Sequence, residues 1–544
     1  MIALLHGYLL EGSGSNLWTR AIVQGLCRAG ETVHLMCQEQ HPEAYDFISK
    51  AIHYHPDGRE EMVLDRTTSY PGEVIFHRPE LGSTLPVYVW DRYDWFEKVT
   101  PMVELDDAAI EAYLQRNVEV LERIIQRHPI TVLHANHTVM MPEVARRAAK
   151  AHGLPYAAMP HGSALEYAVK RDRRFHKMGQ MGLEEATLVV VTGDEVRQRL
   201  NAIYPTLSGL NEKVIQPPLG VDMERFKLVD RTQRRAEIEQ LQQRLARLSP
   251  GANVPMDARL ETLPKQPDRK KFTTCIQEVS HLFDLKKPDE GLARNLERIA
   301  GNDGPVLLYV GRLISAKGVH SILMALPELL RQWPDLKWLV VGHGPLRGIL
   351  EALLWALRCG KREWLRALVR WGSLLEEPAQ PLDSAQGHLD YLAEGGQLER
   401  WFADAERLLK PDTVLFTGYL THAELQHLFP CCDAAVFPSV VAESGPMVFL
   451  EALASGVWPL GTDHAGMAAS IGAFSALHPE LDVSAMKVRP EAAMTVRDIV
   501  AHLPMGVEQL QNSPNLKEIF YNHVRNHHDW RAIADYLNRR LSGS

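Results

Sequence analysis

The sequence contains few cysteines, and their spacing does not suggest a disulfide framework or a metal site. Its six cysteines are Cys27, Cys37, Cys275, Cys359, Cys431 and Cys432. No two of them show the C-x-x-C spacing that is typical of redox and zinc motifs. Scattered thiols of this kind fit a reducing compartment, so we expect a cytoplasmic protein rather than a secreted one.

The sequence also lacks a long hydrophobic run. No apolar stretch approaches the roughly 18 residues that a membrane-spanning helix needs. The first residues, MIALLHGYLL, have neither a basic region nor a small-residue cleavage site, which favours a buried strand over a signal peptide. We therefore expect at most a peripheral contact with a membrane.

A strong excess of one charge is absent as well. Basic residues number 59 and acidic residues 68, which gives a formal net charge of -9. This balance argues against a general nucleic-acid binder. The length of 544 residues exceeds what one hydrophobic core usually organises, so we expect two domains of roughly 200 residues or more.

The N-terminal half alternates strand and helix patterns. A strand at residues 2–5, a helix at 17–29 and a strand at 32–37 form a βαβ unit, which predicts a parallel sheet. Gly12 and Gly14 lie in the loop before this helix, where a ligand could approach the backbone closely. The loop sequence GSGSN lacks the third glycine of the dinucleotide fingerprint, so we do not expect a nicotinamide cofactor.

Two features follow the strand pattern at residues 156–159. His161 stands at its carboxyl end, where ligands of open α/β sheets gather. It is either a satisfied structural histidine or a site residue, and we adopt the second interpretation. The basic run that follows contains Lys170, Arg171, Arg173 and Arg174. This run is either a solvated face or a site for an acceptor phosphate or an anionic lipid surface.

Residues 434–471 predict a strand, a polar turn, a helix at about 446–455 and a second strand. Ser444 or Gly445 can cap this helix, and Pro446 suits its first position. The helix start then presents free N–H groups and a positive dipole end, which favour phosphate or sugar oxygens. The carboxylates of Glu443 and Glu451 stand at and after the helix start, with seven residues between them.

A second candidate site follows the buried strand pattern at residues 305–310. It is the segment GRLISAKG, which contains Arg312 and Lys317. An arginine offers a rigid bidentate fork and a lysine a mobile point charge, and both could neutralise negative charge that develops during a reaction. The alternative is an exposed cationic loop without a catalytic role.

These motifs resemble those of the retaining, nucleotide-sugar-dependent family-4 glycosyltransferases, within the superfamily of glycogen synthase and sucrose-phosphate synthase. Glu443 to Glu451 resembles the Glu-x7-Glu signature, and GRLISAKG resembles G-R-x-x-x-x-K-G. QPPLGVDMERF at residues 216–226 is similar to the hinge signature of that family. The resemblance implies an α/β fold of the GT-B type, with two Rossmann-like domains facing across a cleft.

The resemblance also implies a domain arrangement. Residues 1–222 would form the acceptor domain and residues 223–505 the donor domain, while 506–544 would cross back to the first domain. The donor domain carries two helical insertions, at about 227–300 and 347–409. The second contains several tryptophans at helical spacing, which indicate a local core or an interface for a partner or membrane.

The resemblance further assigns roles to residues. The catalytic set would be His161, Arg312, Lys317 and Glu443. The donor-binding set would be Gly14, Ser15, Gly311, Tyr419, Leu420, Ser444, Gly445, Pro446, Met447, Val448 and Glu451. Lys170, Arg171 and Arg174 are the acceptor-binding candidates.

The implied activity is retaining transfer of a hexosyl group from a nucleoside-diphosphate sugar to a hydroxyl acceptor. The donor would be UDP-glucose or a similar UDP-sugar, or GDP-mannose. No D-x-D motif occurs, so we expect neither a metal nor another cofactor. Ser444-Gly445-Pro446 replaces the Gly-Phe-Gly type of sequence common in the family, which leaves the sugar open. The alternatives are a sugar-nucleotide epimerase or hydrolase of the same fold and a non-catalytic nucleotide-sugar binder. The sequence does not indicate an oligomeric state.

Overall fold

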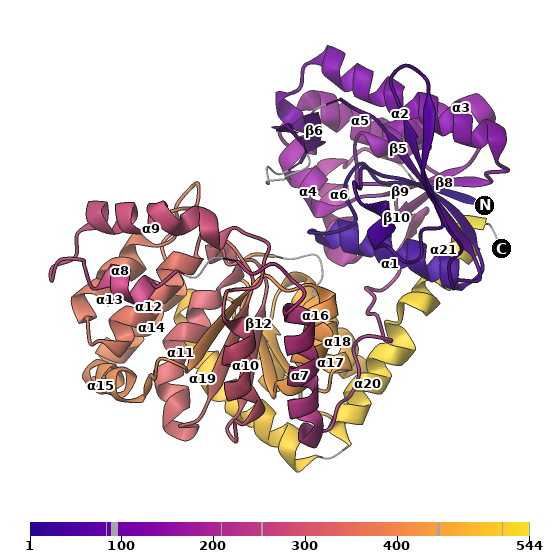
Figure 1. Cartoon of the computed structure of the whole chain (residues 1–544). Coiled ribbons are helices and arrows are strands. Elements are labelled where there is room, and N and C mark those ends of the chain that lie inside the picture. The colour runs from indigo at the N-terminus through magenta and orange to yellow at the C-terminus, as the bar shows by residue number, and fades with distance from the viewer. Residues whose placement is uncertain are drawn as a thin grey trace. The chain divides into compact units, whose positions relative to one another are not determined.

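A computed structural model describes residues 1–82, 84–88, 96–207, 209–251, 254–442, 447–513 and 515–542. The chain divides into two compact units (Figure 1). Met1–Asp222 and His527–Ser544 form the first unit, and Met223–Asn526 forms the second. Each unit contains a largely or wholly parallel sheet accompanied by helices, so the expected α/β class is confirmed.

Among the described residues, the main sheet of the first unit has nine strands in the order β11-β10-β9-β8-β1-β2-β5-β3-β4. Its pairings are parallel except for β3 with β4. The chain runs outward from β1 on one side and from β8 on the other, so these two neighbours mark the switch point of the sheet. The strands are β1 (Ile2–Leu5), β2 (Thr32–Met36), β3 (Lys50–Tyr54), β4 (Glu60–Asp65), β5 (Glu73–Pro79), β8 (Val132–Asn136), β9 (Tyr156–Met159), β10 (Leu188–Val190) and β11 (Val214–Ile215).

The first unit also contains a small parallel pair and several helices. The pair consists of β6 (Thr84–Val87) and β7 (Lys98–Pro101). The helices are α1 (Gly14–Arg28), α2 (Asp107–Arg127), α3 (Met141–His152), α4 (Gly162–Ala164), α5 (Arg173–Glu185), α6 (Asp194–Ile203) and α21 (Trp530–Ser542). Helix α1 begins three residues earlier than its apolar pattern predicts, because the Ser13 side chain accepts a hydrogen bond from the Asn16 N–H at 3.3 Å.

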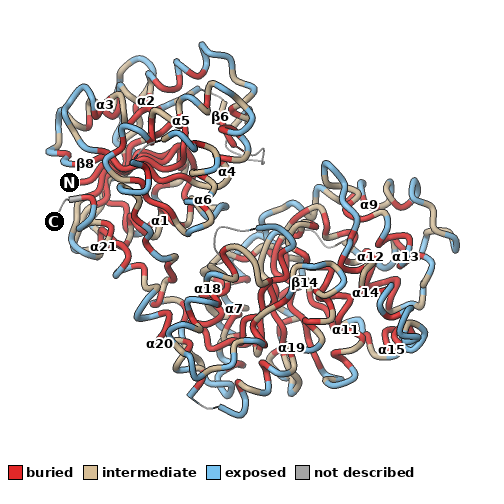
Figure 2. The backbone as a smooth tube through the Cα atoms, turned by 180° about the vertical axis from the view of Figure 1, so that it is seen from behind, coloured by how far each residue is buried: buried red, intermediate tan, exposed pale blue. Residues whose placement is uncertain are grey.

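The described sheet of the second unit is parallel throughout, in the order β14-β13-β12-β15-β16-β17. Its switch point lies between β12 and β15. The strands are β12 (Val306–Val310), β13 (Lys337–Val341), β14 (Val414–Gly418), β15 (Ala434–Phe437), β16 (Trp458–Thr462) and β17 (Lys487–Val488). Most residues of these strands are buried, as expected for a parallel sheet that is covered on both faces (Figure 2).

The helices of the second unit fall into those around the sheet and those of the two insertions. The first group is α11 (Val319–Gln332), α16 (His422–Leu428), α17 (Met447–Ala454), α18 (Ala465–Leu477), α19 (Ala492–Asn512) and α20 (Leu516–His527). The first insertion contains α7 (Arg234–Leu245), α8 (Met256–Leu260), α9 (Arg269–Phe283) and α10 (Leu292–Ala300). The second contains α12 (Arg347–Arg358), α13 (Arg362–Trp371), α14 (Asp383–Glu394) and α15 (Leu398–Leu408).

The two insertions pack against each other through an aromatic cluster. The ring of Phe272 on α9 lies 6.0 Å from that of Trp364 on α13 and 5.9 Å from that of Trp371. Trp364 also donates a hydrogen bond from Nε1 to the Pro264 carbonyl at 3.0 Å. The tryptophan pattern therefore marks a shared core between the insertions, which supports the first of the two alternatives from the sequence.

The C-terminal helix α21 returns to the first unit and lies against α1 (Figure 1). Gly25 of α1 permits this close packing, since a Cβ there would lie 2.7 Å from the Cβ of Ala534. The return begins at His527 rather than at the expected residue 506. The reason is α19, whose Gly506 packs directly on Trp458 and keeps that segment in the second unit.

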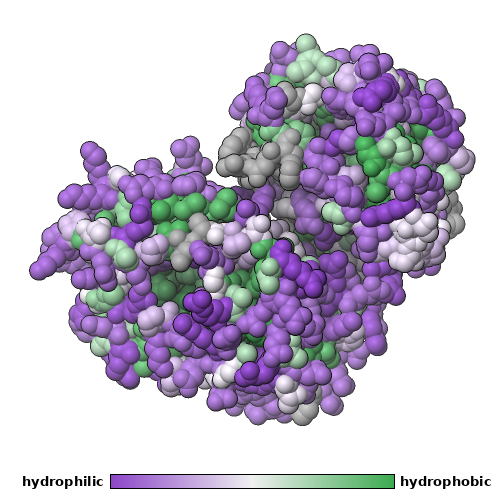
Figure 3. Space-filling view, in the orientation of Figure 1, coloured by the Kyte–Doolittle hydropathy of each residue, from purple (hydrophilic) through white to green (hydrophobic). Residues whose placement is uncertain are grey.

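The surface view shows mostly hydrophilic residues on both units, with hydrophobic residues in separate patches (Figure 3). Within the part of the chain that the structure describes, no helix combines the length and apolar character of a membrane span.

Candidate functional site

The predicted donor motifs of the second unit meet at the switch point of its sheet. Strands β12 and β15 are neighbours and run parallel, so their carboxyl ends lie on the same edge. Residues 311–318 follow β12, and the loop that leads toward Glu443 follows β15. In open α/β sheets this edge is the usual place of a ligand site.

Hydrogen bonds hold these two loops together. The Val440 N–H donates to the Ala316 carbonyl at 2.9 Å, and Ser439 Oγ donates to the same oxygen at 3.2 Å. Gly318 has a φ of 64°, and a Cβ there would lie 1.9 Å from the Pro438 carbonyl oxygen. The glycine is therefore required both by its backbone conformation and by the close approach of the second loop.

The cationic residues of the first loop differ in exposure. Arg312 is exposed, and its guanidinium makes no hydrogen bond or ion pair with a residue that the structure describes. Lys317 is half-buried at the end of a short helical turn, Ser315–Lys317. Gly311 lies at the start of the loop and donates its N–H to the Val341 carbonyl at 3.0 Å.

The turn before α17 lies outside the described residues. It comprises Glu443, Ser444, Gly445 and Pro446, so the predicted contacts of these residues remain predictions. Helix α17 begins at Met447, and Val448 is in its first turn, close to the predicted helix start.

Glu451 is a buried carboxylate with one engaged oxygen and one without a partner. Its residue is 3% exposed, and Oε1 lies 2.8 Å from Nε2 of His422. Its Oε2 has no hydrogen-bond partner among the residues that the structure describes. A buried carboxylate oxygen without a donor is costly, so this atom favours a ligand with a hydroxyl or N–H group. The sequence motif predicted Glu451 but not His422.

His422 is fixed by the start of α16. The Thr421 side chain caps that helix, and Glu424 accepts a hydrogen bond from the Thr421 N–H at 3.0 Å in a capping box. The order Thr-x-x-Glu in the sequence is the signal that could have located this helix start, and with it His422.

Glu376 is a site residue that the sequence did not predict. It belongs to the second insertion, between α13 and α14, and its carboxylate accepts hydrogen bonds from the Ser315 N–H at 2.7 Å and from Ser315 Oγ at 2.5 Å. It thereby fastens the loop that carries Arg312 and Lys317 from outside the sheet. No local motif identifies such a contact, because 61 residues separate the two partners.

Tyr419, a predicted donor-binding residue, contacts the end of the first insertion. The Tyr419 N–H donates to the Lys287 carbonyl at 3.0 Å, and Pro288 forms an antiparallel bridge with Gly418. The end of the first insertion therefore accepts the Tyr419 N–H, and the donor contact predicted for main-chain atoms near Tyr419 and Leu420 stays a prediction. Leu420 is buried, at 5% exposure.

In the first unit, Gly14 and Ser15 form the start of α1 at the switch-point side of the sheet. A Cβ at Gly14 would meet nothing within 4 Å, so its backbone is open to a ligand. Ser15 Oγ lies 3.0 Å from Ser13 Oγ. Both positions are compatible with the predicted donor contact, which stays a prediction.

His161 follows β9 and is half-buried beside other histidines. Burial, with His6 and His134 nearby, lowers the pKa of His161 to about 3, so its imidazole is neutral near pH 7. Its Nε2 lies 3.5 Å from Asn136 Oδ1. A neutral imidazole in this position can exchange hydrogen bonds with a sugar hydroxyl but does not supply a positive charge.

The strand end beside His161 is strained. His137 is buried with a φ of 71°, and neither of its ring nitrogens has a hydrogen-bond partner within the described ranges. Its ring lies 4.8 Å from the ring of His161. Met140, three residues on, has a φ of 62°. Positive φ values outside glycine are uncommon and concentrate at functional sites.

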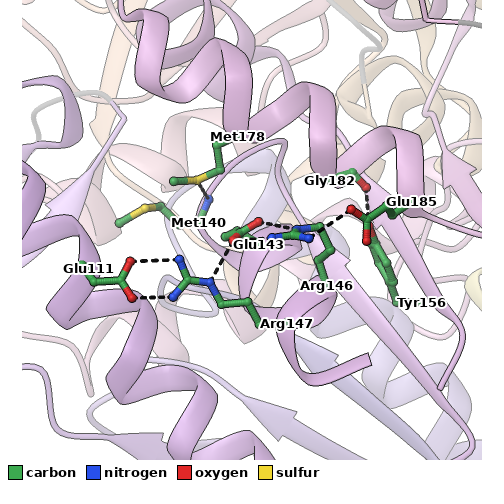
Figure 4. Close-up of polar contacts among 9 residues, drawn as sticks. All are labelled: Glu111, Met140, Glu143, Arg146, Arg147, Tyr156, Met178, Gly182 and Glu185. Carbon is green, nitrogen blue, oxygen red and sulfur yellow. Dashed lines mark hydrogen bonds and ion pairs between the residues drawn. The ribbon is translucent and has the colours of Figure 1, made fainter. Parts of the chain in front are cut away.

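An ion-pair network holds the helix that follows this strained segment (Figure 4). Glu143 on α3 is 5% exposed and accepts hydrogen bonds from Arg146 at 2.7 Å and Arg147 at 2.8 Å. Arg147 continues to Glu111 on α2 and Arg146 to Glu185 on α5. The network ties α3 to its neighbours and so supports the strained strand end.

The basic run after His161 is largely engaged in local contacts. Arg174 donates to Asp172, to Asp107 and to main-chain carbonyls, so all of its guanidinium nitrogens have partners. Lys170 pairs with Glu166 at 2.6 Å, and Arg171 lies over the Tyr167 ring. For Arg174 these contacts favour a structural role over the predicted acceptor contact.

Within the described ranges, no three His, Cys, Asp or Glu side chains are placed so that they could hold a metal ion.

Part of the chain is similar in sequence to known proteins. Residues 387–479 match the family model described as "Glycosyl transferases group 1". The chain is 32% identical over 164 residues to a glycogen synthase of Mycobacterium tuberculosis. This aligned region covers 30% of this chain and 27% of that protein. It is 25% identical over 258 residues to a 2-deoxystreptamine glucosyltransferase of Streptomyces kanamyceticus. This aligned region covers 47% of this chain and 48% of that protein. The chain thus spans about a quarter to a half of the length of these curated relatives.

The fold has relatives along the whole chain. Sucrose-phosphate synthase from Thermosynechococcus elongatus aligns with 99% of this chain and 97% of its own, at 15% identity and a TM-score of 0.52. Anabaena HepE in complex with UDP-glucose aligns with 100% of this chain and 99% of its own, at 13% identity and a TM-score of 0.51.

Two α/β units with parallel sheets and these structural relatives define the GT-B architecture. Within the second unit, residues 387–479 match a glycosyltransferase family model, so the fold and this match together indicate similarity to GT-B glycosyltransferases.

Proposed function

We propose that this protein is a retaining glycosyltransferase that moves a hexosyl group from a nucleoside-diphosphate sugar to a hydroxyl acceptor without a metal ion. The observation that carries the proposal is the meeting of two loops at the switch point of the second unit. The loop with Arg312 and Lys317 is hydrogen-bonded through Ala316 to the loop that leads into the predicted Glu443 turn.

This arrangement suits the chemistry of glycosyl transfer. A nucleoside diphosphate departs with developing negative charge, and fixed positive groups at the point of departure lower the barrier. Arg312 has no partner among the described residues and could turn its guanidinium to the diphosphate. Lys317 and the start of α17 would supply a second cation and oriented N–H groups.

Glu451 would bind the ribose of the donor. Its buried Oε2 lacks a donor, and an ionised carboxylate accepts hydroxyl protons well. Glu443 would hold hydroxyls of the donor sugar in the same way. His161 of the first unit would contact the transferred sugar as a neutral imidazole. No protein nucleophile is needed, because in same-face transfer the departing phosphate helps to deprotonate the acceptor.

For the donor we favour UDP-glucose or a similar UDP-sugar, with GDP-mannose as the alternative. HepE, whose fold this chain shares, is solved with UDP-glucose. A thermal-shift screen with UDP-, GDP- and ADP-sugars will identify the base, since a ligand of the native state raises the melting temperature.

The decisive test is Lys317→Ala. We expect the rate of sugar transfer to fall by about 10²-fold or more, because a charge contact made in the transition state is lost. Nucleoside-diphosphate release with the donor from the screen, in the presence and absence of acceptor candidates, measures this rate. Circular dichroism verifies that the variant is folded.

Lys361→Ala is the matched control, since Lys361 is an exposed lysine of the same unit. Its transfer rate should equal that of the unchanged protein. Wild-type rates for Lys317→Ala would refute the proposed site. Release that needs no acceptor, or formation of an epimer, would indicate the hydrolase or epimerase alternative, and donor binding without turnover would indicate a non-catalytic binder.

A further inference from the structure

A polar pocket of about 490 Å³ opens in the first unit, at the carboxyl ends of β2, β3 and β5. We call it the Arg78 pocket. The side chains that matter for its chemistry are Gln38, Gln40, His53, His55, Arg78 and Phe96. None of them belongs to the site predicted from the sequence.

Arg78 brings a positive charge to this pocket without a carboxylate partner. Its Nη1 donates to Gln40 Oε1 at 2.5 Å and its Nη2 to His53 Nδ1 at 2.7 Å, and both acceptors are neutral. Burial lowers the pKa of Arg78 from its usual value, which indicates that the charge is partly withdrawn from water. Within the described ranges no acidic side chain forms an ion pair with Arg78.

His53 adds a donor without an acceptor. Because its Nδ1 accepts from Arg78, the proton of the neutral imidazole resides on Nε2. That Nε2 is buried and has no hydrogen-bond partner in the described part of the chain. Burial and the neighbouring Arg78 lower the pKa of His53 to about 4, so the ring stays neutral near pH 7. A buried N–H group without an acceptor indicates a missing partner with an oxygen atom.

Two acidic residues line the pocket: Glu80 is already engaged, and Glu97 is exposed. Glu80 accepts from His55 Nδ1 at 3.0 Å, and His55 Nε2 lies 2.8 Å from Glu61. Gln38 donates from its side chain to the Pro79 carbonyl at 3.0 Å. Phe96 is half-buried and adds an aromatic group to the lining. Among the described residues, the pocket therefore offers a cation without an ion-pair partner, an N–H donor without an acceptor and an aromatic group, beside the carboxylates of Glu80 and Glu97.

We propose that the Arg78 pocket binds the carboxylate or phosphate of an anionic carbohydrate, and that this carbohydrate is the acceptor. The second half of the statement rests on the proposed glycosyltransferase function. A guanidinium with an adjacent N–H donor matches the oxygens of a carboxylate or phosphate, and the aromatic ring suits the body of a sugar.

The position of the pocket fits an extended acceptor. The pocket and His161 lie on the same edge of one sheet, and four strand spacings separate β9 from β5, which corresponds to roughly 19 Å. The residues between are in contact: the Gln38 N–H donates to the Tyr8 carbonyl at 2.9 Å, and the ring of His137 lies 5.3 Å from that of Tyr8 and 4.8 Å from that of His161. An acceptor that spans this edge is longer than one sugar residue.

The first experiment measures anion binding without any donor, so it does not depend on the proposed function. Glucuronate, glucose 6-phosphate and neutral glucose are titrated into the full chain, and the imidazole signals of His53 are followed by NMR. We expect a saturable change with at least one of the two anionic sugars and none with glucose. Arg78→Gln should weaken that binding at least tenfold.

Arg127→Gln is the matched control, because it removes the same charge from an exposed position of the same unit. It should bind as the unchanged protein does. No saturable response to either anionic sugar, or equal affinity in Arg78→Gln, would overturn the proposal. Arg78→Lys keeps the positive charge. Anion binding that persists in Arg78→Lys but is lost in Arg78→Gln comes from loss of the charge and not from a general folding defect.

The second experiment asks whether the bound anion occupies the acceptor site. In the transfer assay, the anionic sugar should raise the KM for the acceptor and leave the KM for the donor unchanged. An anion that activates or inhibits without competing with the acceptor would be a separate effector, and the acceptor assignment would be wrong. The proposed transfer itself would then still stand, since Lys317→Ala tests it independently.

Discussion

At the scale of single residues, the clearest feature is the asymmetry of the Glu451 carboxylate. One oxygen lies against His422, and the other is buried without a partner. His422 keeps the carboxylate in a fixed orientation, so binding a ligand at the second oxygen requires little further ordering of the side chain. Fixed polar groups of this kind bind more strongly than mobile ones because less entropy is lost.

We therefore predict that Glu451→Gln weakens binding of the nucleoside diphosphate by about 10- to 100-fold, because a charged acceptor is replaced by an amide. Isothermal titration with the nucleotide from the donor screen measures the effect. Glu508→Gln, an exposed change on α19, should leave the affinity unchanged.

A ribose-modified nucleotide makes this test specific. Removing the hydroxyl that Glu451 contacts should weaken binding to the unchanged protein but add little to the loss in Glu451→Gln, because both changes delete the same hydrogen bond. Additive losses would show that Glu451 acts elsewhere.

The sequence predicted Glu451 but not the residues that surround it. Glu451 belongs to a spacing motif that can be read locally. His422, by contrast, reaches it from 29 positions away. The free N–H of His53 likewise depends on Arg78, which is 25 residues distant. Contacts between distant segments leave no periodic signal, so the partners of a site residue can be found only in the folded chain.

At the scale of elements, the loop between β12 and α11 is held from two sides. Pro438 approaches Gly318 on one side, and Glu376 of the second insertion accepts two hydrogen bonds from Ser315 on the other. The insertion thereby holds the loop that carries Arg312 and Lys317, although it lies outside the sheet. We expect it to restrict the loop rather than to contact the proposed donor.

Glu376→Ala should therefore raise the donor KM by about tenfold, because two donors of Ser315 lose their acceptor and the loop with Lys317 becomes less ordered. Steady-state kinetics at varied donor concentration measure this value. Glu376→Gln keeps one acceptor oxygen, so its donor KM should lie between those of the unchanged protein and Glu376→Ala.

The neighbouring Glu377→Ala is the control, since Glu377 is exposed. A change in melting temperature with unaltered kinetics would show that Glu376 supports only the fold. Equal KM values for Glu376→Ala and the unchanged protein would contradict its positioning role.

Most elements around the sheets could be predicted from sequence patterns, and their ends were the less accurate part. Residues 156–159 coincide with β9, whereas α1 begins earlier than predicted because Ser13 caps it. The hydrogen bond from the Tyr419 N–H to the Lys287 carbonyl could not be predicted, because Lys287 belongs to an insertion that the resemblance does not describe.

At the scale of the whole molecule, buried neutral histidines link stability to pH. His6 and His134 are at most 1% exposed, and burial lowers the pKa of each to about 4. In the unfolded chain a histidine titrates near 6.5, so these residues take up protons on unfolding at mildly acidic pH. Their contribution is fully present above pH 6.5 and is lost as the pH falls toward 4.

We predict that the free energy of unfolding decreases between pH 7 and pH 5, by about 2 kcal/mol for each such histidine. Urea unfolding at the two pH values, followed by a probe in the first unit, measures the change. His134→Gln should reduce the dependence on pH. Equal stability at pH 7 and pH 5 would contradict the burial of neutral imidazoles.

Phe272 of the first insertion packs against Trp364 and Trp371 of the second, so the two insertions depend on each other structurally. Neither could have been acquired alone in its present form, because each covers aromatic rings of the other. Homologues should therefore carry both additions or neither, and a shortened version of the protein has to remove them together.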